Sequence, residues 1–565
     1  EPDSELNNNT NLKGNWVWSN TITYDINKDD HRATLLAGNE QIKYGEEWFG
    51  ASREGYLIES MDYAYLSTGS EEQLNSGLGT GWSLQSFFAK VNYSYKYKYL
   101  ASLTMRRDGS SRFGKNYKYG NFPAFSLGWR IGDEPFMKNL ISIPFSLKLR
   151  ASWGMNGNQE INNLAIYNIY KPVYSKEDAI WDGPNPPEYM PDLGTAYDIS
   201  GIDQGQLESG FITTQIRNED LKWETTTQTN VGMDFSLFNV ISGSIEYFRK
   251  QTDDILYYRM LPGAVGEASG QYVNGGSIEN KGLEFMVSYT DQTGDFSYDI
   301  SANASFLKNK VLDMPEDLTI RMPLAEIIPN EAKTELPVSI LIGESVNSIY
   351  GYIADGIFQD EEEVLAHAEQ PGKDVGRIRF RDISGPDGSP DEKVDDYDQK
   401  FIATAQPDLT YGLDLQLGYK DFSFNMFLQG IHGIEVYNGY KTYTDFTSLW
   451  PGTNFGKRTL DAWSEENKNS EIPKLTTIDS NNEGRLSTYF IENGSYFKLR
   501  NIQLGYNISM ENRNNSQIRD VYVYLQGQNL FTIKSKSFTG PDPENPNYAF
   551  PIPAAYTVGL KISLQ

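Results

Sequence analysis

Residues 382–399, "DISGPDGSPDEKVDDYDQ", combine closely spaced acidic side chains with a turn-forming glycine. Oxygen ligands from such side chains can surround a hard cation such as calcium. The candidate ligands are Asp382, Ser384, Asp387 and Asp398. Two prolines within the segment interrupt the spacing of a calcium loop, so a solvated acidic turn is the alternative. A structural calcium ion is therefore a candidate, and the sequence indicates no other cofactor.

Five aromatic residues fall in long stretches without strand character: Trp181, Tyr189, Tyr440, Tyr443 and Trp450. Rings of this kind can stack on sugars or contact the apolar side chains of peptides. Packing of one loop on another is the alternative explanation. These five are the candidate substrate-binding residues.

The composition argues against several other kinds of chemistry. The chain has no cysteine, which excludes disulfides, thiolate metal sites and cysteine nucleophiles. Its three histidines, His31, His367 and His432, are far apart in sequence, and no Ser/His/Asp or paired-carboxylate arrangement stands out. The formal net charge of -27 would repel a phosphate backbone. We therefore predict a protein that is not an enzyme and does not bind nucleic acid.

The stretch "VNYSYKY" alternates with a period of two, which is typical of a β-strand. Val91, Tyr93, Tyr95 and Tyr97 share one parity, whereas the alternate positions are asparagine, serine and lysine. A half-buried strand of a soluble sandwich would show this pattern. A transmembrane barrel shows it too, with apolar residues toward lipid and aromatic residues near the membrane interface. In that case these four residues would share the outer face.

About fifteen stretches have strand character. They are 16–24, 33–41, 86–95, 99–107, 122–131, 146–155, 227–238, 242–250, 282–290, 296–307, 409–419, 422–431, 497–509, 520–531 and 555–564. Short connections alternate with long ones, which are 156–226, 252–279, 310–408 and 432–496. This asymmetry is typical of outer-membrane barrels, so we expect the long segments on one side, the extracellular one. Within one of them, Asp360 is placed to cap a short helix.

The number of predicted strands indicates part of a larger barrel, because single-chain bacterial barrels have even strand numbers. We expect the remaining strands, and the plug that fills the pore, to lie N-terminal to Glu1 or on another chain. No run of 18 apolar residues is present, so no transmembrane helix is predicted.

Several ordered blocks resemble the SusC/RagA family of TonB-dependent outer-membrane transporters. The first is "RRDGSSRFGKNYKYGNFPAFSLGWRIGDEPFM", followed by "LKLRASWGMNGNQEI". "NEDLKWETTTQTNVGMDF", "NKGLEFMVSY" and "PDLTYGLDLQLGYKDFSFNMFLQGIHGIEVYN" come next, in the family's order. "ENGSYFKLRNIQLGYNIS", "FTGPDPE" and "FPIPAAYTVGLKISL" match its end. In this family the place of residues 382–399 often reads like a calcium loop.

The resemblance implies an all-β fold, in which residues 1–565 form the C-terminal part of a transmembrane antiparallel barrel of roughly 22 strands. It also implies a plug, the TonB system and a SusD-like surface lipoprotein as partners, and a location in the outer membrane of a Gram-negative cell. The implied function is import of oligosaccharides or peptides. A scaffold barrel that holds surface lipoproteins or envelope proteins without transport is the alternative.

Overall fold

The computed structural model describes residues 4–58, 60–140, 143–173, 210–260, 270–315, 342–346, 348–450, 452–509, 518–546, 550 and 552–564. The chain divides into two compact units. The first comprises 1–128, 152–229 and 251–277, and the second comprises 129–151, 230–250 and 278–565. No helix in the described ranges is long and apolar enough to cross a membrane.

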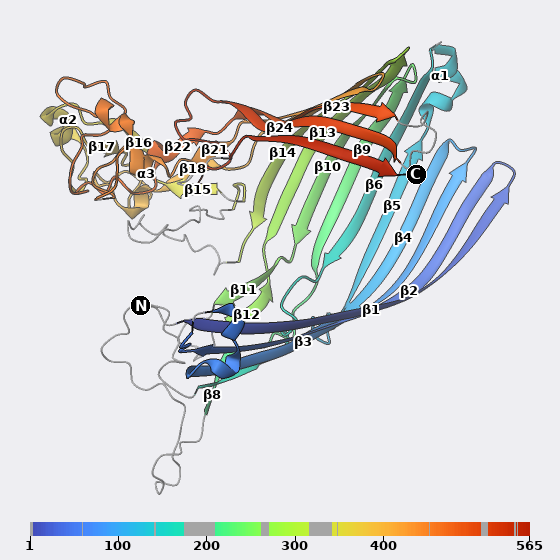
Figure 1. Ribbon diagram of the computed structural model, residues 1–565, viewed down its shortest axis with the longest axis horizontal. Helices are drawn as coiled ribbons and strands as arrows, with labels where there is room; N and C mark the ends of the chain where they lie inside the picture. The colour runs from blue at the N-terminus through green and yellow to red at the C-terminus, as the bar shows by residue number, and fades with distance from the viewer. Residues whose placement is uncertain are drawn as a thin grey trace, which may run out of the picture. The chain divides into compact units, whose positions relative to one another are not determined.

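One large antiparallel sheet contains fifteen strands, in the order β1-β2-β3-β4-β5-β6-β9-β10-β13-β14-β19-β20-β23-β24-β25 (Figure 1). Their bounds are β1 (Glu5–Lys28), β2 (His31–Glu54), β3 (Glu71–Tyr95), β4 (Tyr99–Ser110), β5 (Tyr119–Trp129), β6 (Phe145–Asn158), β9 (Glu224–Leu237), β10 (Ile241–Asp253), β13 (Ser277–Thr293), β14 (Phe296–Asp313), β19 (Leu409–Tyr419), β20 (Phe422–His432), β23 (Tyr496–Ser509), β24 (Ile518–Lys534) and β25 (Ala555–Leu564). Each of the fifteen predicted stretches overlaps one of these strands, and the stretches 122–131 and 227–238 run one or two residues past the strand end, so the strand prediction is confirmed.

The two faces of the sheet differ in polarity where β1 to β4 pair. Tyr24, Leu35, Val91 and Leu103 lie in one cross-strand row, and all four are exposed apolar side chains. The next row, which points to the opposite face, consists of Asp25, Thr34, Asn92 and Ser102. The sheet therefore presents an apolar face and a polar face, as the alternation predicts.

Tyr97 lies just outside β3, as the predicted stretch 86–95 implies, and its place on the outer face stays a prediction. Residues 96–98 form the turn between β3 and β4, and Lys96 and Tyr97 have positive φ angles of 51° and 57°. A left-handed backbone ends the period-two alternation, so the face of Tyr97 is set by the turn. The tyrosines at 93 and 95 remain on β3.

Connections at the two ends of the sheet differ in length, because successive antiparallel strands place alternate connections at the same end. The short turns 29–30, 96–98, 238–240, 294–295 and 420–421 share one end. At the same end, α1 (Pro135–Leu140) lies between β5 and β6. The segments 159–223, 254–276, 314–408 and 433–495 share the other end. The predicted sorting of connections is confirmed, and their extracellular side stays a prediction.

The long connections contain further elements in two-stranded sheets. These are β7 (Ile169–Val173) with β8 (Gly210–Gln215), β11 (Leu256–Met260) with β12 (Gly270–Asn274), β15 (Ser348–Gly351) with β18 (Lys400–Thr404), β16 (Ala354–Ile357) with β17 (Ile378–Phe380), and β21 (Glu435–Tyr437) with β22 (Ile491–Asn493). Two helices also occur, α2 (Glu361–Ala366) and α3 (Lys441–Thr444). Asp360 caps α2 as predicted, because its carboxylate accepts a hydrogen bond from the Glu363 amide at 2.9 Å.

In the second unit, the two longest connections fold together around one apolar core. Ile378 and Phe380 come from segment 314–408, whereas Phe446 and Phe490 come from segment 433–495, and all four are buried. Such a core holds the connections in one arrangement. We call residues 348–404 and 433–493 the loop module.

If the apolar face of the sheet contacts a bilayer, as the resemblance implies, a charged substitution should destabilise the barrel more on that face than on the polar face. Leu103→Lys places a cation on the apolar face and should destabilise the barrel by about 2–4 kcal/mol near the bilayer midplane. Ser102→Lys, one residue away on the polar face, is the matched control and should cost much less. Urea unfolding of the full protein in vesicles measures both, and equal costs would contradict the assignment of faces.

Candidate functional site

The loop module contains three of the five predicted substrate-binding residues. Tyr440, Tyr443 and Trp450 are all half-buried, and the other two, Trp181 and Tyr189, lie outside the described residues. The rings of Tyr443 and Trp450 stack with centroids 4.5 Å apart and planes 13° apart. The structure therefore brings two predicted residues into one aromatic pair. A ring pair with a hydroxyl can contact a sugar or an apolar peptide side chain, and this role stays a prediction.

Both members of the aromatic pair are fixed by their surroundings. Tyr440 precedes α3, and Tyr443 lies on it. The indole Nε1 of Trp450 donates to Oγ1 of Thr442 at 3.2 Å, and Trp450 also packs against the core of the module. Trp450 thus also takes part in the packing of one loop on another, which the sequence offers as the alternative role. A stack fixed in this way loses little side-chain entropy when a ligand binds.

A buried carboxylate positions the segment that contains the pair. Asp445 is fully buried and accepts hydrogen bonds from Nε of Arg458 at 2.8 Å, the hydroxyl of Tyr489 at 2.8 Å and the hydroxyl of Thr444 at 2.8 Å. Burial and the nearby Asp445 charge raise the pKa of Tyr489 well above its usual value. The tyrosine therefore stays a hydrogen-bond donor, and the carboxylate is satisfied inside the module.

A second buried carboxylate fixes α3 itself. Nζ of Lys441 lies 3.3 Å from Oε1 of Glu492 and donates to the backbone oxygen of Tyr489 at 2.6 Å. Glu492 also accepts hydrogen bonds from the Asn438 amide at 2.7 Å and from the Thr539 backbone at 2.9 Å. These contacts tie the aromatic segment to β22 and to the connection before β25.

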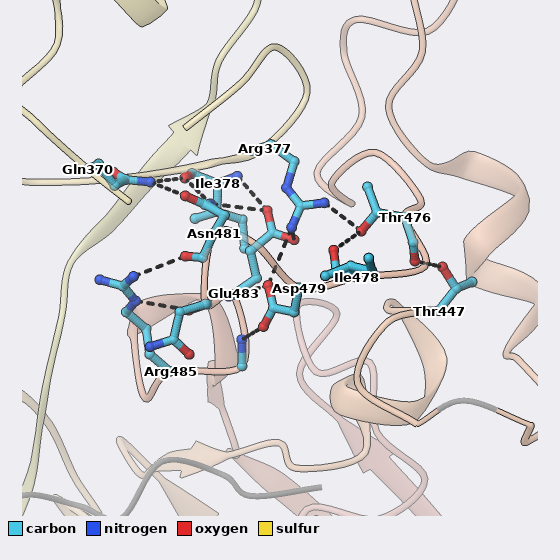
Figure 2. A network of polar contacts seen from close by, with 12 residues as sticks. Gln370, Arg377, Ile378, Thr447, Thr476, Ile478, Asp479, Asn481, Glu483 and Arg485 are labelled. Atoms are coloured by element: carbon cyan, nitrogen blue, oxygen red, sulfur yellow. Dashed lines mark hydrogen bonds and ion pairs between the residues drawn. The ribbon is translucent and has the colours of Figure 1, made fainter. Parts of the chain in front are cut away.

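Figure 2 shows a polar network that joins the two long connections within the module. Arg377 is 2% exposed, and its Nη2 lies 2.9 Å from Oε2 of Glu483 and 3.3 Å from Oδ1 of Asp479. The other carboxylate oxygen of Glu483 accepts a hydrogen bond from the Ile378 amide at 2.9 Å. Nη1 of Arg377 donates to the hydroxyl of Thr476 at 2.5 Å. One guanidinium therefore organises residues 476–483 against β17.

The same network includes the amide side chains of Gln370 and Asn481 (Figure 2). The amide of Gln370 donates to Oδ1 of Asn481 at 2.6 Å, and the amide of Asn481 donates to the Ile378 oxygen at 2.9 Å. Burial raises the pKa of Glu483 to about 7, although the Arg377 guanidinium opposes the shift. A protonated Glu483 is thus accessible near neutral pH, and its neutral isostere should be tolerated.

In the acidic turn, residues 382–399, carboxylate oxygens accept hydrogen bonds from backbone amides. Oδ1 of Asp398 accepts hydrogen bonds from the amides of Ile383 at 2.7 Å and Ser384 at 3.1 Å, and its Oδ2 accepts one from Asp395 at 2.7 Å. Oδ1 of Asp387 accepts one from the Ser389 amide at 3.0 Å.

Asp382 differs from its neighbours in the acidic turn. Its Oδ2 accepts a hydrogen bond from the Glu392 amide at 2.7 Å. Its Oδ1 is buried without a hydrogen-bond partner among the described residues. No group of three or more His, Asp or Glu side chains in the described ranges is arranged to hold a metal ion. The residues therefore fit a cation only in part, and calcium at this turn stays a prediction.

The first unit has a smaller core beside a basic stretch. Phe113 and Trp223 meet there with ring centroids 4.9 Å apart. Arg106 pairs with Asp108 at 2.8 Å, and Arg112 pairs with Glu160 at 3.3 Å. Arg106 and Arg112 of "RRDGSSRFG" thus serve the structure through acidic partners, whereas Arg107 lies over the ring of Tyr119.

The buried network predicts a ranked response to substitution. Arg377→Met leaves the buried Glu483 and the half-buried Asp479 without their cation and should lower the free energy of opening of the module by about 3–5 kcal/mol. Glu483→Gln keeps an acceptor for Ile378 and leaves Asp479 beside Arg377, so it should cost about 1–3 kcal/mol. Native-state hydrogen exchange of residues 348–404 and 433–493 in the full protein measures both. Equal protection in the two variants would contradict the central role of Arg377.

Comparison with known proteins supports the fold. Residues 3–327 match the family described as TonB dependent receptor-like, beta-barrel. The chain is 31% identical over 552 residues to TonB-dependent receptor P3 of Formosa agariphila, covering 96% of this chain and 50% of that protein. It is 29% identical to TonB-dependent receptor SusC of Bacteroides thetaiotaomicron, covering 98% of this chain and 50% of that protein. The chain thus spans about half the length of these relatives.

A solved structure of the RagAB peptide transporter is similar in fold. It superposes with a TM-score of 0.77 at 24% identity, and the match covers 99% of this chain and 56% of the RagAB chain. These relatives are described as TonB-dependent receptors and as a peptide transporter. With its fifteen-stranded ladder and long connections at one end, the chain belongs to the TonB-dependent receptor-like β-barrel family.

Proposed function

We propose that the complete protein imports oligosaccharides or peptides across the outer membrane, driven by the TonB system, together with a SusD-like surface lipoprotein. The observation that supports this most is the loop module. A barrel that serves only as a scaffold needs no ordered aromatic pair, whereas Tyr443 and Trp450 stack at 4.5 Å in a segment fixed by buried ion pairs.

The substrate class follows from the chemistry of this pair. Stacked aromatic rings favour flat apolar faces, such as those of a pyranose ring or a peptide side chain, over small ions. A ligand with several hydroxyls or amides would also find hydrogen-bond partners among the polar groups of the module. The similarity in fold to the RagAB peptide transporter supports the peptide alternative.

The proposal predicts that removing the stack weakens ligand binding without unfolding the module. Trp450→Ala combined with Tyr443→Ala should lower the affinity of the full complex for its oligosaccharide or peptide by about tenfold or more, since two aromatic contacts are lost. Native mass spectrometry with a panel of both ligand classes measures the affinity. Tyr397→Ala is the control, because this exposed tyrosine lies in the same module.

Two outcomes would contradict the proposal. The first is wild-type protein that binds no member of the panel but still retains surface lipoproteins, which would favour a scaffold. The second is a double variant with unchanged affinity, which would move the binding site away from the stack.

A further inference from the structure

The apolar face of β1 to β4 ends in a row of basic and aromatic side chains. This last row before the short turns 29–30 and 96–98 consists of Lys28, His31, Tyr95 and Tyr99. We call these four residues the boundary row. They share a face with the apolar row through Leu35, because each lies four residues from that row along its strand. At about 3.3 Å per residue, the two rows are about 13 Å apart.

Ring contacts hold the boundary row in a defined arrangement. The ring centroids of His31 and Tyr95 are 4.8 Å apart, and the rings of Tyr95 and Tyr99 stack with centroids 6.2 Å apart. Nδ1 of His31 lies 2.7 Å from the hydroxyl of Tyr93, which belongs to the next row of the same face. When this hydroxyl donates to Nδ1, the proton of the neutral imidazole is on Nε2. Nε2 is then a hydrogen-bond donor for a ligand.

The two short turns beside the boundary row are joined to each other. The amide of Lys96 donates to the backbone oxygen of Asp30 at 2.8 Å, and Nζ of Lys96 lies 3.5 Å from Oδ2 of Asp30. The same Nζ lies 5.3 Å from the ring centroid of Tyr95. A second cation is therefore fixed next to the boundary row.

The charge around the boundary row is opposite in sign to that of the chain. Residues 28–32 and 96–98 contain four basic side chains, Lys28, Arg32, Lys96 and Lys98, against two acidic ones, Asp29 and Asp30. The whole chain has a formal net charge of -27. The short turns 238–240, 294–295 and 420–421 together contain one basic and two acidic side chains. The local excess of positive charge at the boundary row attracts an anion.

The rows next to the boundary row determine which anion fits. On the same face they expose the apolar side chains of Tyr24, Ile26, Leu35, Val91 and Leu103. In a family of outer-membrane barrels this face contacts lipid. A soluble anion would use only the boundary row, and a soluble protein would have to displace lipid from the apolar rows. A phospholipid matches both parts, because its phosphate lies directly beside its acyl chains.

We propose that the boundary row binds the headgroup phosphate of an anionic phospholipid, with Lys28 and Nε2 of His31 as donors and the acyl chains along the apolar rows. Charge-assisted hydrogen bonds to phosphate are among the stronger polar contacts of proteins. Tyr95 and Tyr99 contact the region between the phosphate and the chains, where amphipathic rings are favoured. The inference rests on the location in the outer membrane and does not depend on import.

The test measures phospholipid binding to the complete protein in detergent by native mass spectrometry. The probes are phosphatidylglycerol, phosphatidylethanolamine and inorganic phosphate. Lys28→Gln with His31→Phe removes the two donors and keeps an aromatic ring beside Tyr95. Lys420→Gln with His432→Phe removes the same residue types at the two ends of β20 and is the matched control. The affinity for phosphatidylglycerol should fall about tenfold in the first variant and change little in the control.

Three results would overturn the proposal. The first is an equal affinity of wild type and the Lys28/His31 variant for phosphatidylglycerol. The second is an equal affinity of wild type for phosphatidylglycerol and phosphatidylethanolamine, which would show no preference for an anionic headgroup. The third is inorganic phosphate that binds as tightly as the lipid, which would assign the row to a free anion. Heat-modifiable electrophoresis checks that both variants fold.

A phosphatidylglycerol with a photoactivatable headgroup gives a second readout that uses only the wild-type protein. Cross-links to residues 28–32 or 95–99 support the proposal. Cross-links confined to other strands overturn it, whatever the stability of the variants.

Discussion

An unpaired backbone N–H or C=O group costs several kcal/mol in hydrocarbon, because no water is present to replace the missing hydrogen bond. This constraint explains why the sheet is one continuous ladder from β1 to β25 and why its short turns are so tight. It also explains the polarity of the strands. Rows such as Tyr24–Leu35–Val91–Leu103 suit lipid, and the next row, which includes Asn92 and Ser102, suits a polar interior.

Outside the sheet the backbone does not lie in hydrocarbon, so this constraint no longer applies. Ordering a long connection costs conformational entropy, which buried contacts must offset. The loop module does so with an apolar core around Phe380 and Phe490 and with ion pairs at Arg377 and Asp445. The segment that Asp445 fixes also contains the stacked pair Tyr443 and Trp450, and Trp450 packs against the core. In the proposed function, stability and recognition would thus depend on neighbouring buried interactions.

The sequence predicted the sheet well because a two-residue period and turn composition are local signals. All fifteen strands and the helix capped by Asp360 were found this way. The alternation ends at Tyr95 because Lys96 and Tyr97 have positive φ angles, although neither is a glycine. The module was not predicted. Arg377 and Glu483 are far apart in the chain, and nothing near either residue indicates its partner. The sequence indicates Tyr443 and Trp450 as candidate residues, but only the structure shows that their rings stack.

The most direct test of the account is the import of a labelled oligosaccharide or peptide by cells that produce the complete protein, with and without a functional TonB system. The account predicts uptake that requires both the protein and TonB and that follows the ligand class bound by the loop module. Uptake that is equal without TonB, or cells that take up neither class while the protein is folded in the outer membrane, would contradict it.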